Sequence, residues 1–304
     1  MFRTTPSGPE ASVTRYRKTF AAVAAIVIVV IALAISLQLY AVQKDHGQTM
    51  HMIGDIDTPD RIDLDVTIIQ IDAVMQEMSV QVLPTPRGAL ADESGRFRAD
   101  TAIELYGLKS QPIQAKAGEL LSASELRIAM GGNGMITDYP FDRYTADIDV
   151  LATSGAAAVP ISINLYSLDT FFKVAPKVNV EQRGDVVGSV VTVTRSTASR
   201  TFALFVMVLM LGLALAAATA AFYVLSGRRG LIWPANTLMA AVLFAMIPLR
   251  NAVPGGPPIG SVIDFGSFFI AETVVALSLI CTVLIGYRHE IGNERAAARS
   301  DATL

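Results

Sequence analysis

Four long apolar stretches constrain this chain more than any other feature of its sequence. They cover residues 20–42, 201–225, 231–249 and 262–286. As helices, with about 1.5 Å of rise per residue, all four are long enough to cross a hydrocarbon core of roughly 30 Å. Only helices and closed barrels satisfy their backbone groups in lipid, so the stretches predict transmembrane helices. We therefore expect an N-terminal anchor, a polar segment over residues 43–200, and a C-terminal three-helix transmembrane bundle over residues 201–286.

The positive side chains beside these stretches indicate their orientation. If the stretches alternate in direction, nine cations fall on one side of the membrane: Arg3, Arg15, Arg17, Lys18, Arg228, Arg229, Arg288, Arg295 and Arg299. Because cytoplasmic loops carry the excess of Lys and Arg, the tails over residues 1–19 and 287–304 are expected in the cytosol. Residues 43–200 are then extracytoplasmic, and we expect a multi-pass protein of the plasma membrane.

A cleaved signal peptide is the alternative interpretation of the first stretch. Its apolar run is longer than the usual h-region of a signal peptide, and no clear cleavage site follows it. We therefore expect an uncleaved anchor.

The extracytoplasmic segment has the pattern of short strands. In residues 61–72, the apolar residues Ile62, Leu64 and Val66 alternate with polar ones, which is typical of a half-buried strand. Similar runs cover residues 78–83, 98–106, 125–130, 144–151, 160–166 and 187–194. Turn-forming clusters separate these runs, and no long amphipathic helix interrupts them. We therefore expect an antiparallel β-sandwich, joined to the anchor by a tether over residues 43–60.

The charge of this segment bears on its partners. Residues 43–200 carry 14 Lys and Arg against 21 Asp and Glu, a formal charge of −7. A phosphate-binding surface needs cations, so we expect no nucleic-acid partner. The single cysteine, Cys281, lies in the last apolar stretch, which excludes an intrachain disulfide. The expected partners are the lipid bilayer and either a protein partner or further copies of the chain.

No pattern of residues predicts catalysis. The chain has no Gly-x-Ser-x-Gly, His-Glu-x-x-His, Walker or dinucleotide-binding motif. His46 and His51 lie among several aspartates, but their spacing matches no known pattern of metal ligands, and aspartate is common in exposed turns. We therefore expect neither an enzyme nor a cofactor or metal site.

The most specific string in the segment is Tyr-Pro-Phe-Asp-Arg-Tyr, residues 139–144. An aromatic residue before proline raises the cis fraction of that peptide bond, which suits a tight turn. One interpretation is a hairpin turn whose aromatic side chains pack into the sandwich. The string also resembles the aromatic-Pro-Phe-Asp turn of pentameric ligand-gated ion channels. Its surroundings are similar too, because Arg195 and Arg200 precede the second stretch and residues 257–265 resemble the loop after the pore-lining helix of those channels.

The resemblance to these channels implies a contact between the turn and the membrane domain. In the channels the turn touches the loop between the second and third pore-domain helices, which here covers residues 250–261. We therefore expect Asp142 to lie near Arg195, Arg200 or Arg250, with Phe141 against the loop or the helix ends.

Three features depart from the channel pattern. The stretch in the position of the pore helix, residues 231–249, has only Asn236 and Thr237 as polar residues. Arg228 and Arg229 at its cytosolic mouth would repel cations. The fourth helix of the channel family is missing, and the N-terminal anchor stands in its place.

Over most of its length the chain is similar to an uncharacterised family of actinobacterial membrane proteins, defined by domain of unknown function 4436. The similarity rests on residues 139–144, on Leu249-Arg250-Asn251, and on residues 254–260 with Asp264. It implies a cell-envelope protein without a known activity, and the 18 Arg against 6 Lys suit a GC-rich actinobacterial genome. The channel resemblance then describes architecture, since fold does not determine function.

Two sets of candidate site residues follow from these patterns. Glu272 lies about ten residues into the last stretch, where an ionised carboxylate exposed to lipid costs at least about 2.5 to 3.5 kcal/mol, so it should face protein. It makes either a proton or ion contact or a hydrogen bond between helices, and Gly212 and Ala245 lie at the matching depth. The residues expected to couple the outer segment to the membrane are Tyr139, Pro140, Phe141, Asp142, Arg195, Arg200, Arg250, Asn251, Pro257, Pro258 and Asp264. Of these, Arg250 and Asp264 are expected to pair with each other or with loop backbone.

The sequence therefore predicts a non-catalytic integral membrane protein of the cell envelope, whose sandwich binds a ligand or partner. Two alternatives stay open: a subunit of a ligand-gated-channel-like oligomer, and an accessory subunit of an envelope export complex.

Overall fold

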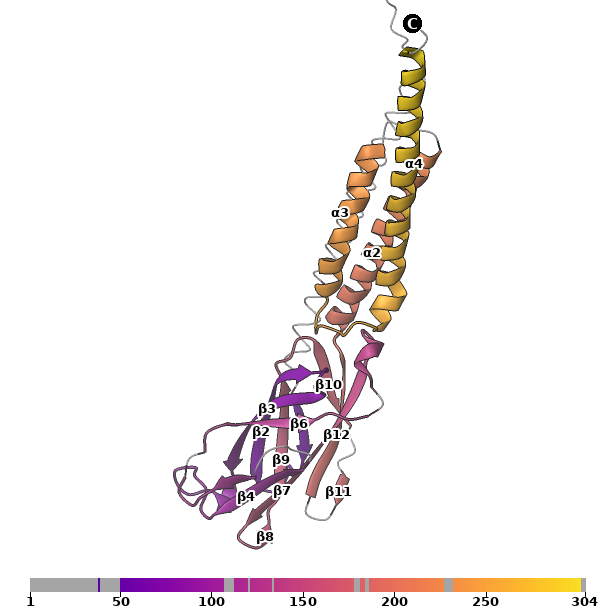
Figure 1. Ribbon diagram of the computed structural model, residues 1–304. Coiled ribbons are helices and arrows are strands. Elements are labelled where there is room, and N and C mark those ends of the chain that lie inside the picture. Colours follow the sequence, from indigo (N-terminus) through magenta and orange to yellow (C-terminus); the bar gives the residue numbers. More distant parts are fainter. Residues whose placement is uncertain are drawn as a thin grey trace, which may run out of the picture. The chain divides into compact units, whose positions relative to one another are not determined.

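The computed structural model describes residue 38 and residues 50–301, apart from residues 107–111, 120, 133, 178–180, 184–185 and 227–231. The chain divides into two units, residues 1–46 and residues 47–304. The expected anchor lies outside the described residues apart from Gln38, and the tail over residues 1–19 and the Arg228-Arg229 turn lie outside them entirely. The strands and helices shown in Figure 1 belong to the second unit.

The β domain, residues 50–196, contains two sheets. The first sheet has five strands in the order β1-β9-β2-β3-β6. Their bounds are His51–Gly54 for β1, Ile62–Asp72 for β2, Glu77–Pro86 for β3, Ser124–Ala129 for β6 and Ile161–Ser167 for β9. Two short 3-10 helices, η1 (Gly88–Leu90) and η2 (Ile136–Asp138), lie in the connections of the domain.

The second sheet has seven strands, five of them in the order β10-β12-β7-β4-β5. Their bounds are Phe172–Pro176 for β10, Val186–Arg195 for β12, Arg143–Ser154 for β7, Thr101–Tyr106 for β4 and Ile113–Ala115 for β5. The other two are short: β8 (Ala157–Ala158) pairs with β7, and β11 (Glu181–Arg183) pairs with β12.

Side chains from both sheets form one buried core. Leu64, Val66 and Ile68 of β2 are fully buried, and they share the core with residues of the second sheet such as Ile148 and Val191. These are the alternating apolar positions of the predicted strands, and burying one such side chain contributes about 1.5 to 3 kcal/mol. The seven strands predicted from periodicity are all present, as β2, β3, β4, β6, β7, β9 and β12.

Two expectations for this domain were wrong. The sheets are not purely antiparallel, because β2 and β9 pair in parallel, with Ile62 opposite Ile161. Alternation of apolar residues identifies the buried face of a strand but not the direction of its neighbour, and parallel strands need only a long connection. The expected tether also contains structure: β1, residues 51–54, pairs with β9.

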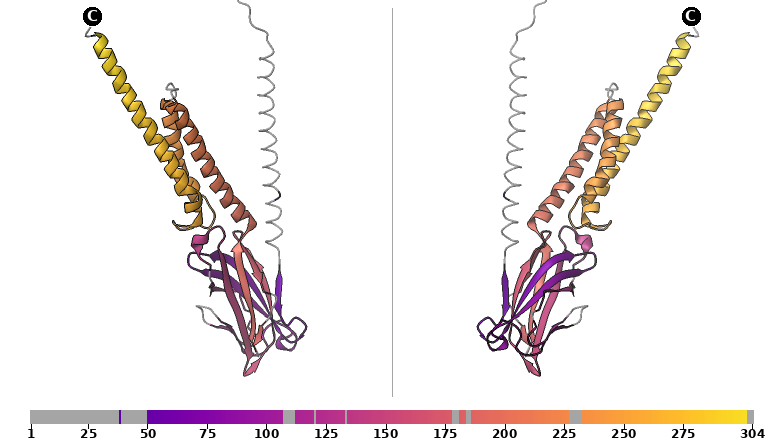
Figure 2. Two further views of the ribbon diagram at one scale, coloured as in Figure 1. Left: turned by 90° about the vertical axis from the view of Figure 1, so that its right-hand side faces the viewer. Right: turned by 90° about the vertical axis from the view of Figure 1, so that its left-hand side faces the viewer.

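Three helices follow the β domain and pack against one another (Figure 2). They are α2 (Thr197–Leu225), α3 (Ile232–Asn251) and α4 (Phe269–Asp301), and a π-helical turn, η4 (Asp264–Phe268), precedes α4. Within the described part of the chain, two segments are long and apolar enough to cross a membrane: α2 and residues 264–288. The helix α3 is not among these segments; it contains the polar residues Asn236 and Thr237 and, in its last turn, Arg250.

The helix α2 begins directly where β12 ends. The Ser196 hydroxyl accepts a hydrogen bond from the Ser199 N–H, which is the usual cap of a helix N-terminus. The helix therefore starts at Thr197, four residues before the apolar stretch. At the other end of the chain, α4 continues to Asp301, well beyond residue 286 where the apolar stretch ends.

Candidate site at the junction of the β domain and the helices

Tyr139 is the residue of the Tyr-Pro-Phe-Asp turn that reaches the helices. It is fully buried, and it belongs to the apolar cluster formed by helix residues such as Val206 and Ile263. Phe141, which we expected in this place, is 58% exposed. The peptide bond between Tyr139 and Pro140 is cis, and Pro140 is buried as well.

Asp142 and Arg195 form a buried ion pair beside Tyr139. The Arg195 Nε atom lies 3.0 Å from both carboxylate oxygens of Asp142, and both side chains are 0% exposed. The Tyr144 hydroxyl donates a second hydrogen bond, of 2.9 Å, to Asp142 Oδ2. Arg195 is the last residue of β12 and precedes Ser196, the cap of α2. This pair therefore joins the Tyr-Pro-Phe-Asp turn to the end of the strand that leads into α2.

Aromatic rings also contact the Arg195 guanidinium. Its Cζ atom lies 4.1 Å from the ring centroid of Phe172 and 4.9 Å from that of Tyr139, which are distances typical of cation–π contacts. The terminal nitrogens Nη1 and Nη2 are buried without a hydrogen-bond partner among the described residues. The rings and the Asp142 carboxylate therefore supply most of the stabilisation of this buried cation.

Gly255, in the loop between α3 and α4, lies directly against Arg195. A Cβ atom built on Gly255 would collide with Nη1 of Arg195, and the backbone of Gly255 has a φ of +80°, which favours glycine. Arg195 thus contacts the Tyr-Pro-Phe-Asp turn on one side and the α3–α4 loop on another.

A second buried ion pair holds the α3–α4 loop in shape. Arg250 Nε lies 2.8 Å from Asp264 Oδ1, and Nη2 lies 2.9 Å from Oδ2. Arg250 also donates to the carbonyl oxygens of Pro257 and Pro258, at 3.0 Å each. Asp264 Oδ2 accepts from the backbone N–H groups of Gly260 and Ser261. The pair thus has both kinds of partner that we expected, each other and loop backbone.

Burial changes the titration of the two tyrosines at the junction. Burial raises the pKa of Tyr139 to about 12, although the charge of Arg195 opposes part of the shift. Burial also raises the pKa of Tyr144, with further contributions from the charge of Asp142 and from the hydrogen bond to it. Both hydroxyls therefore stay protonated at neutral pH.

The remaining candidate residues are not part of this cluster. Arg200 and Asn251 are exposed, and Arg200 does not take the role of partner to Asp142. Glu272 lies in the first turn of α4, and its Oε2 atom is buried without a hydrogen-bond partner among the described residues. Gly212 and Ala245 face outward instead of packing against it, because equal depth does not determine which way a helix face points.

Sequence reasoning missed two residues of the junction. Phe172 carried no signal, because nothing local distinguishes it from other strand residues. Gly255 lies in a Gly-Gly-Pro-Pro string that indicates a restricted loop, but only the contact with Arg195 shows why a side chain would not fit there.

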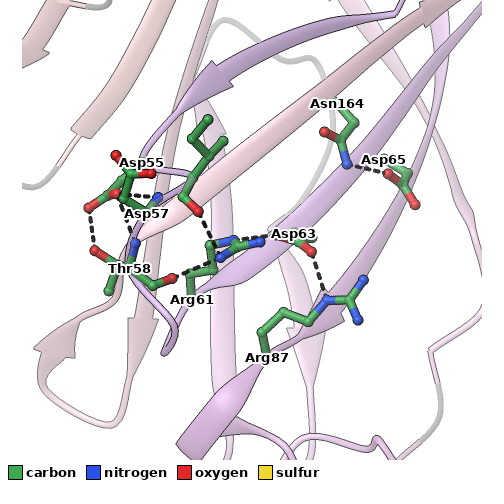
Figure 3. Close-up of polar contacts among 9 residues, drawn as sticks. Asp55, Asp57, Thr58, Arg61, Asp63, Asp65, Arg87 and Asn164 are labelled. Atoms are coloured by element: carbon green, nitrogen blue, oxygen red, sulfur yellow. Dashed lines mark hydrogen bonds and ion pairs between the residues drawn. The ribbon is translucent and has the colours of Figure 1, made fainter.

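A polar cluster at the start of β2 includes Asp55 and Asp57, two of the aspartates that follow His51 in the sequence (Figure 3). Arg61 and Arg87 each place Nε 2.7 Å from Asp63, on opposite carboxylate oxygens. Arg61 also donates to the carbonyl oxygens of Ile56 and Thr58, and Thr58 donates to Asp55. Among the described residues, no group of three His, Cys, Asp or Glu side chains is placed to hold a metal ion. The cluster ties the segment before β2 to the end of β3.

The charge of Asp63 is stabilised within this cluster. Burial alone would raise the pKa of its carboxyl, but the hydrogen bonds from Arg87 and Arg61 outweigh burial and lower the pKa below its usual value.

The structure thus defines a mostly β domain joined by a buried charged junction to apolar helices, two of which could cross a membrane. Residues 52–194 match the family model described as domain of unknown function DUF4436, and residues 195–289 match a second, domain of unknown function DUF8686. These matches confirm the expected similarity to an uncharacterised family of such domains. No curated protein matches the chain. The boundary between the two matches falls at Arg195, so the Asp142–Arg195 pair connects one matched region to the other.

Proposed function

We propose that the protein is a non-catalytic, multi-pass membrane protein of the cell envelope. Its two sheets form an extracytoplasmic β-sandwich that binds a ligand or partner, and the junction at Arg195 couples this domain to the helices. The high arginine content suits an actinobacterial source.

The outer surface of the helices supports the location in a membrane. Each of the three helices carries large apolar side chains that are more than half exposed, among them Val208, Leu215, Phe222, Phe244 and Leu284. A water-soluble protein rarely exposes so large a continuous apolar surface, whereas lipid would cover it at no cost. The exposed apolar face of α3 suits the same environment, although its Asn236, Thr237 and Arg250 lower its mean hydropathy.

The orientation of the protein can be tested with single cysteines in a Cys281→Ala background. Ser94 is exposed in the β domain, so Ser94→Cys should react with an impermeant thiol reagent in intact cells. A cysteine in place of Arg228 should react only after the cells are permeabilised. Equal labelling of both in intact cells would contradict the orientation.

The observation that carries the proposed coupling is the position of Arg195. One buried side chain contacts Asp142 of the β domain and Gly255 of the α3–α4 loop, and its own backbone precedes α2. A displacement of the Tyr-Pro-Phe-Asp turn would therefore move a charge that also touches the helix-connecting loop. The β domain and the α3–α4 loop therefore do not rearrange independently while Arg195 contacts both of them.

A labelling experiment tests the coupling. Ile259 is highly exposed in the α3–α4 loop, so an Ile259→Cys variant in the same Cys281→Ala background reports the state of that loop through its thiol reaction rate. Adding Asp142→Asn should change this rate, because it releases Arg195 from the β domain. Adding Arg127→Met, which removes a cation elsewhere on the β domain, should leave the rate unchanged. An Asp142→Asn rate equal to that of the control would contradict the coupling.

One observation favours a second candidate, a subunit of a channel-like oligomer. The contact of the Tyr-Pro-Phe-Asp turn with an arginine before the first bundle helix resembles the arrangement that suggested the channels. Against conduction, the Asn236 side chain accepts a hydrogen bond from Thr282 of α4, so it is not available to line a pore. Native mass measurement in nanodiscs separates the candidates: a stable pentamer favours the channel, a monomer favours the binding protein, and a hetero-complex favours an accessory subunit of an export complex.

A further inference from the structure

Exposed apolar side chains of the β domain gather at one end of it. Eleven large apolar side chains are exposed among its described residues, and seven of them lie near the C-terminal ends of β2 and β9 or in the β6–β7 connection. We call these seven the apolar rim: Ile69, Val74, Met75, Met135, Phe141, Leu168 and Phe171. Isolated exposed apolar residues are common, but a group of this size in one place marks an interaction surface.

The strand register places the whole rim at the end of the domain from which α2 leaves. The strands β2 and β9 run in parallel, and β6 runs in the same direction because both β2 and β6 are antiparallel to β3. Their C-terminal ends therefore lie together. Phe172, just after the β9–β10 turn, pairs with Arg195, the last residue before the helix cap.

The β9–β10 turn is bonded directly to the first turn of α2. The Phe171 carbonyl oxygen accepts hydrogen bonds from the Ser196 N–H at 2.8 Å and from the Ser199 hydroxyl at 3.1 Å. The exposed apolar side chains of α2 begin at Phe202. From Ser196 to Phe202 the helix rises about 9 Å. The headgroup layer on each side of a bilayer is roughly 5 to 8 Å thick, so a membrane whose hydrocarbon core begins at Phe202 would extend to within about 1 to 4 Å of the level of Ser196, a gap that the rim side chains can span.

Two of the rim turns line an open hollow of about 510 Å³. It is lined by residues of the β2–β3 turn and of the β9–β10 turn, together with Arg195 and Gly255. Asp72 and Asp169 hold these turns in shape: Asp72 accepts from the N–H groups of Val74 and Met75, and Asp169 from that of Phe171. Their carboxylates are thus engaged with the backbone of the same residues whose apolar side chains point outward.

We propose that the apolar rim is a lipid-contact surface, which lies in the interfacial layer of the bilayer that holds α2. This inference rests on the membrane location proposed above, and it adds that the β domain itself touches lipid. Apolar side chains on turns beside a membrane helix are stabilised by burial at the boundary between headgroups and acyl chains. Exposed polar residues between the rim and the exposed apolar side chains of α2 include Thr170, Thr197 and Arg200, and polar and charged side chains at this level suit the headgroup layer.

Tryptophan fluorescence in bilayers tests the proposal. The protein has one tryptophan, so Trp233→Phe provides a background without tryptophan. In this background, Leu168→Trp and Met75→Trp place a probe on two different rim turns, each at a residue about 65% exposed. The control variant Ala156→Trp places an exposed probe in the β7–β8 turn, at the opposite end of the domain. All variants are reconstituted as full chains into phosphatidylcholine vesicles that contain either a headgroup nitroxide or a mid-chain nitroxide.

The rim probes should be quenched by the headgroup nitroxide more strongly than the Ala156→Trp probe, and iodide in solution should quench them less. Quenching of both rim probes equal to that of Ala156→Trp would overturn the proposal. A fourth variant, Val208→Trp in the middle of α2, separates this outcome from failure of the membrane location. If the mid-chain nitroxide quenches Val208→Trp while the rim probes behave like the control, only the lipid contact is wrong. If it does not, the membrane location and the lipid contact both fail.

Discussion

Replacing Asp142 with asparagine removes the counter-charge of the most deeply buried cation in the junction. The amide keeps the size of the carboxylate and one oxygen that can accept a hydrogen bond. It leaves the Arg195 guanidinium, which is 0% exposed, without a compensating charge. Removing one partner of a buried ion pair typically costs about 3 to 5 kcal/mol. For a domain of this size each kcal/mol lowers the melting temperature by about 2 to 4 °C, so we expect a fall of roughly 6 to 20 °C.

A double variant shows whether the loss comes from the unpaired charge. Arg195→Met removes the cation but keeps an apolar chain beside the rings of Phe172 and Tyr139, where sulfur–aromatic contacts are favourable. Combined with Asp142→Asn, it should recover much of the stability, because a buried pair replaced as a whole by apolar groups often costs little. The difference between the double variant and the sum of the single variants measures the coupling of the two residues.

The assay is thermal unfolding of the full chain in detergent at neutral pH, followed by near-ultraviolet circular dichroism. Arg127→Met is the matched control, because Arg127 lies 3.8 Å from Glu77 in a pair whose arginine side chain is 67% exposed. The Glu77 side chain is only 11% exposed, but solvent screens the mostly exposed Arg127, so the pair contributes at most about 1 kcal/mol and the control should melt within a few degrees of the parent protein. The reasoning is refuted if Asp142→Asn melts at the temperature of the control, or if the double variant is as unstable as the two single changes added together.

Three further predictions concern the same domain and its junction. Gly255→Ala should lower the melting temperature more than Gly256→Ala does. Both positions have a positive φ, which costs an alanine about 1 to 2 kcal/mol, but only the methyl group at position 255 would also collide with Arg195. Equal losses of stability would contradict the contact between Gly255 and Arg195. Tyr139→Phe should melt no lower than the parent at pH 7, since the buried hydroxyl has no partner among the described residues. Because the pKa of Tyr139 is raised in the folded protein, it contributes stability that is fully present below pH 10 and is lost as the pH rises toward about 12. Tyr139→Phe should therefore lose less stability than the parent protein over that range. Parallel curves of stability against pH for the two proteins would exclude the effect. Because the pKa of Asp63 is lowered in the folded protein, it contributes stability that is present above the unfolded value of 3.8 and is lost as the pH falls further. Asp63→Asn should therefore cost about 1 to 3 kcal/mol at pH 7 and make stability depend less on pH in the acid range. Unchanged acid dependence in that variant would assign this dependence to other carboxylates.

Periodicity located the long strands because burial of alternate residues is a local property of the sequence. β2 shows this most clearly, with Ile62, Leu64, Val66 and Ile68 all fully buried. Strands of two or three residues, such as β5, β8 and β11, are too short for an alternation to be recognised. β1 was assigned to a tether because Gly54 and Pro59 near it favour turns, and only its pairing with β9 makes it a strand.

The junction shows where prediction from sequence ends. The string at residues 139–144 indicated a turn that contacts the membrane domain, and Asp142 had three arginines as possible partners. Choosing among them requires the register between β7 and β12, which pairs Arg143 with Thr194 and so places Asp142 beside Arg195. The same geometry buries Tyr139 and exposes Phe141, although both are aromatic residues of one turn.

The sequence by itself determined the apolar segments that are long enough to cross a membrane, the strand-rich character of residues 50–196, and the absence of known catalytic motifs. These properties depend on composition and on spacing over a few residues, where the physics of burial acts on each segment separately. Only the tertiary structure decided that Arg195 pairs with Asp142, that Gly255 lies against it, and that the residues of the apolar rim lie at the end of the β domain from which α2 leaves. Asp142 and Arg195 are 53 residues apart, and Gly255 is further still along the chain. Contacts over such separations depend on strand register and helix packing, which no local pattern of residues specifies.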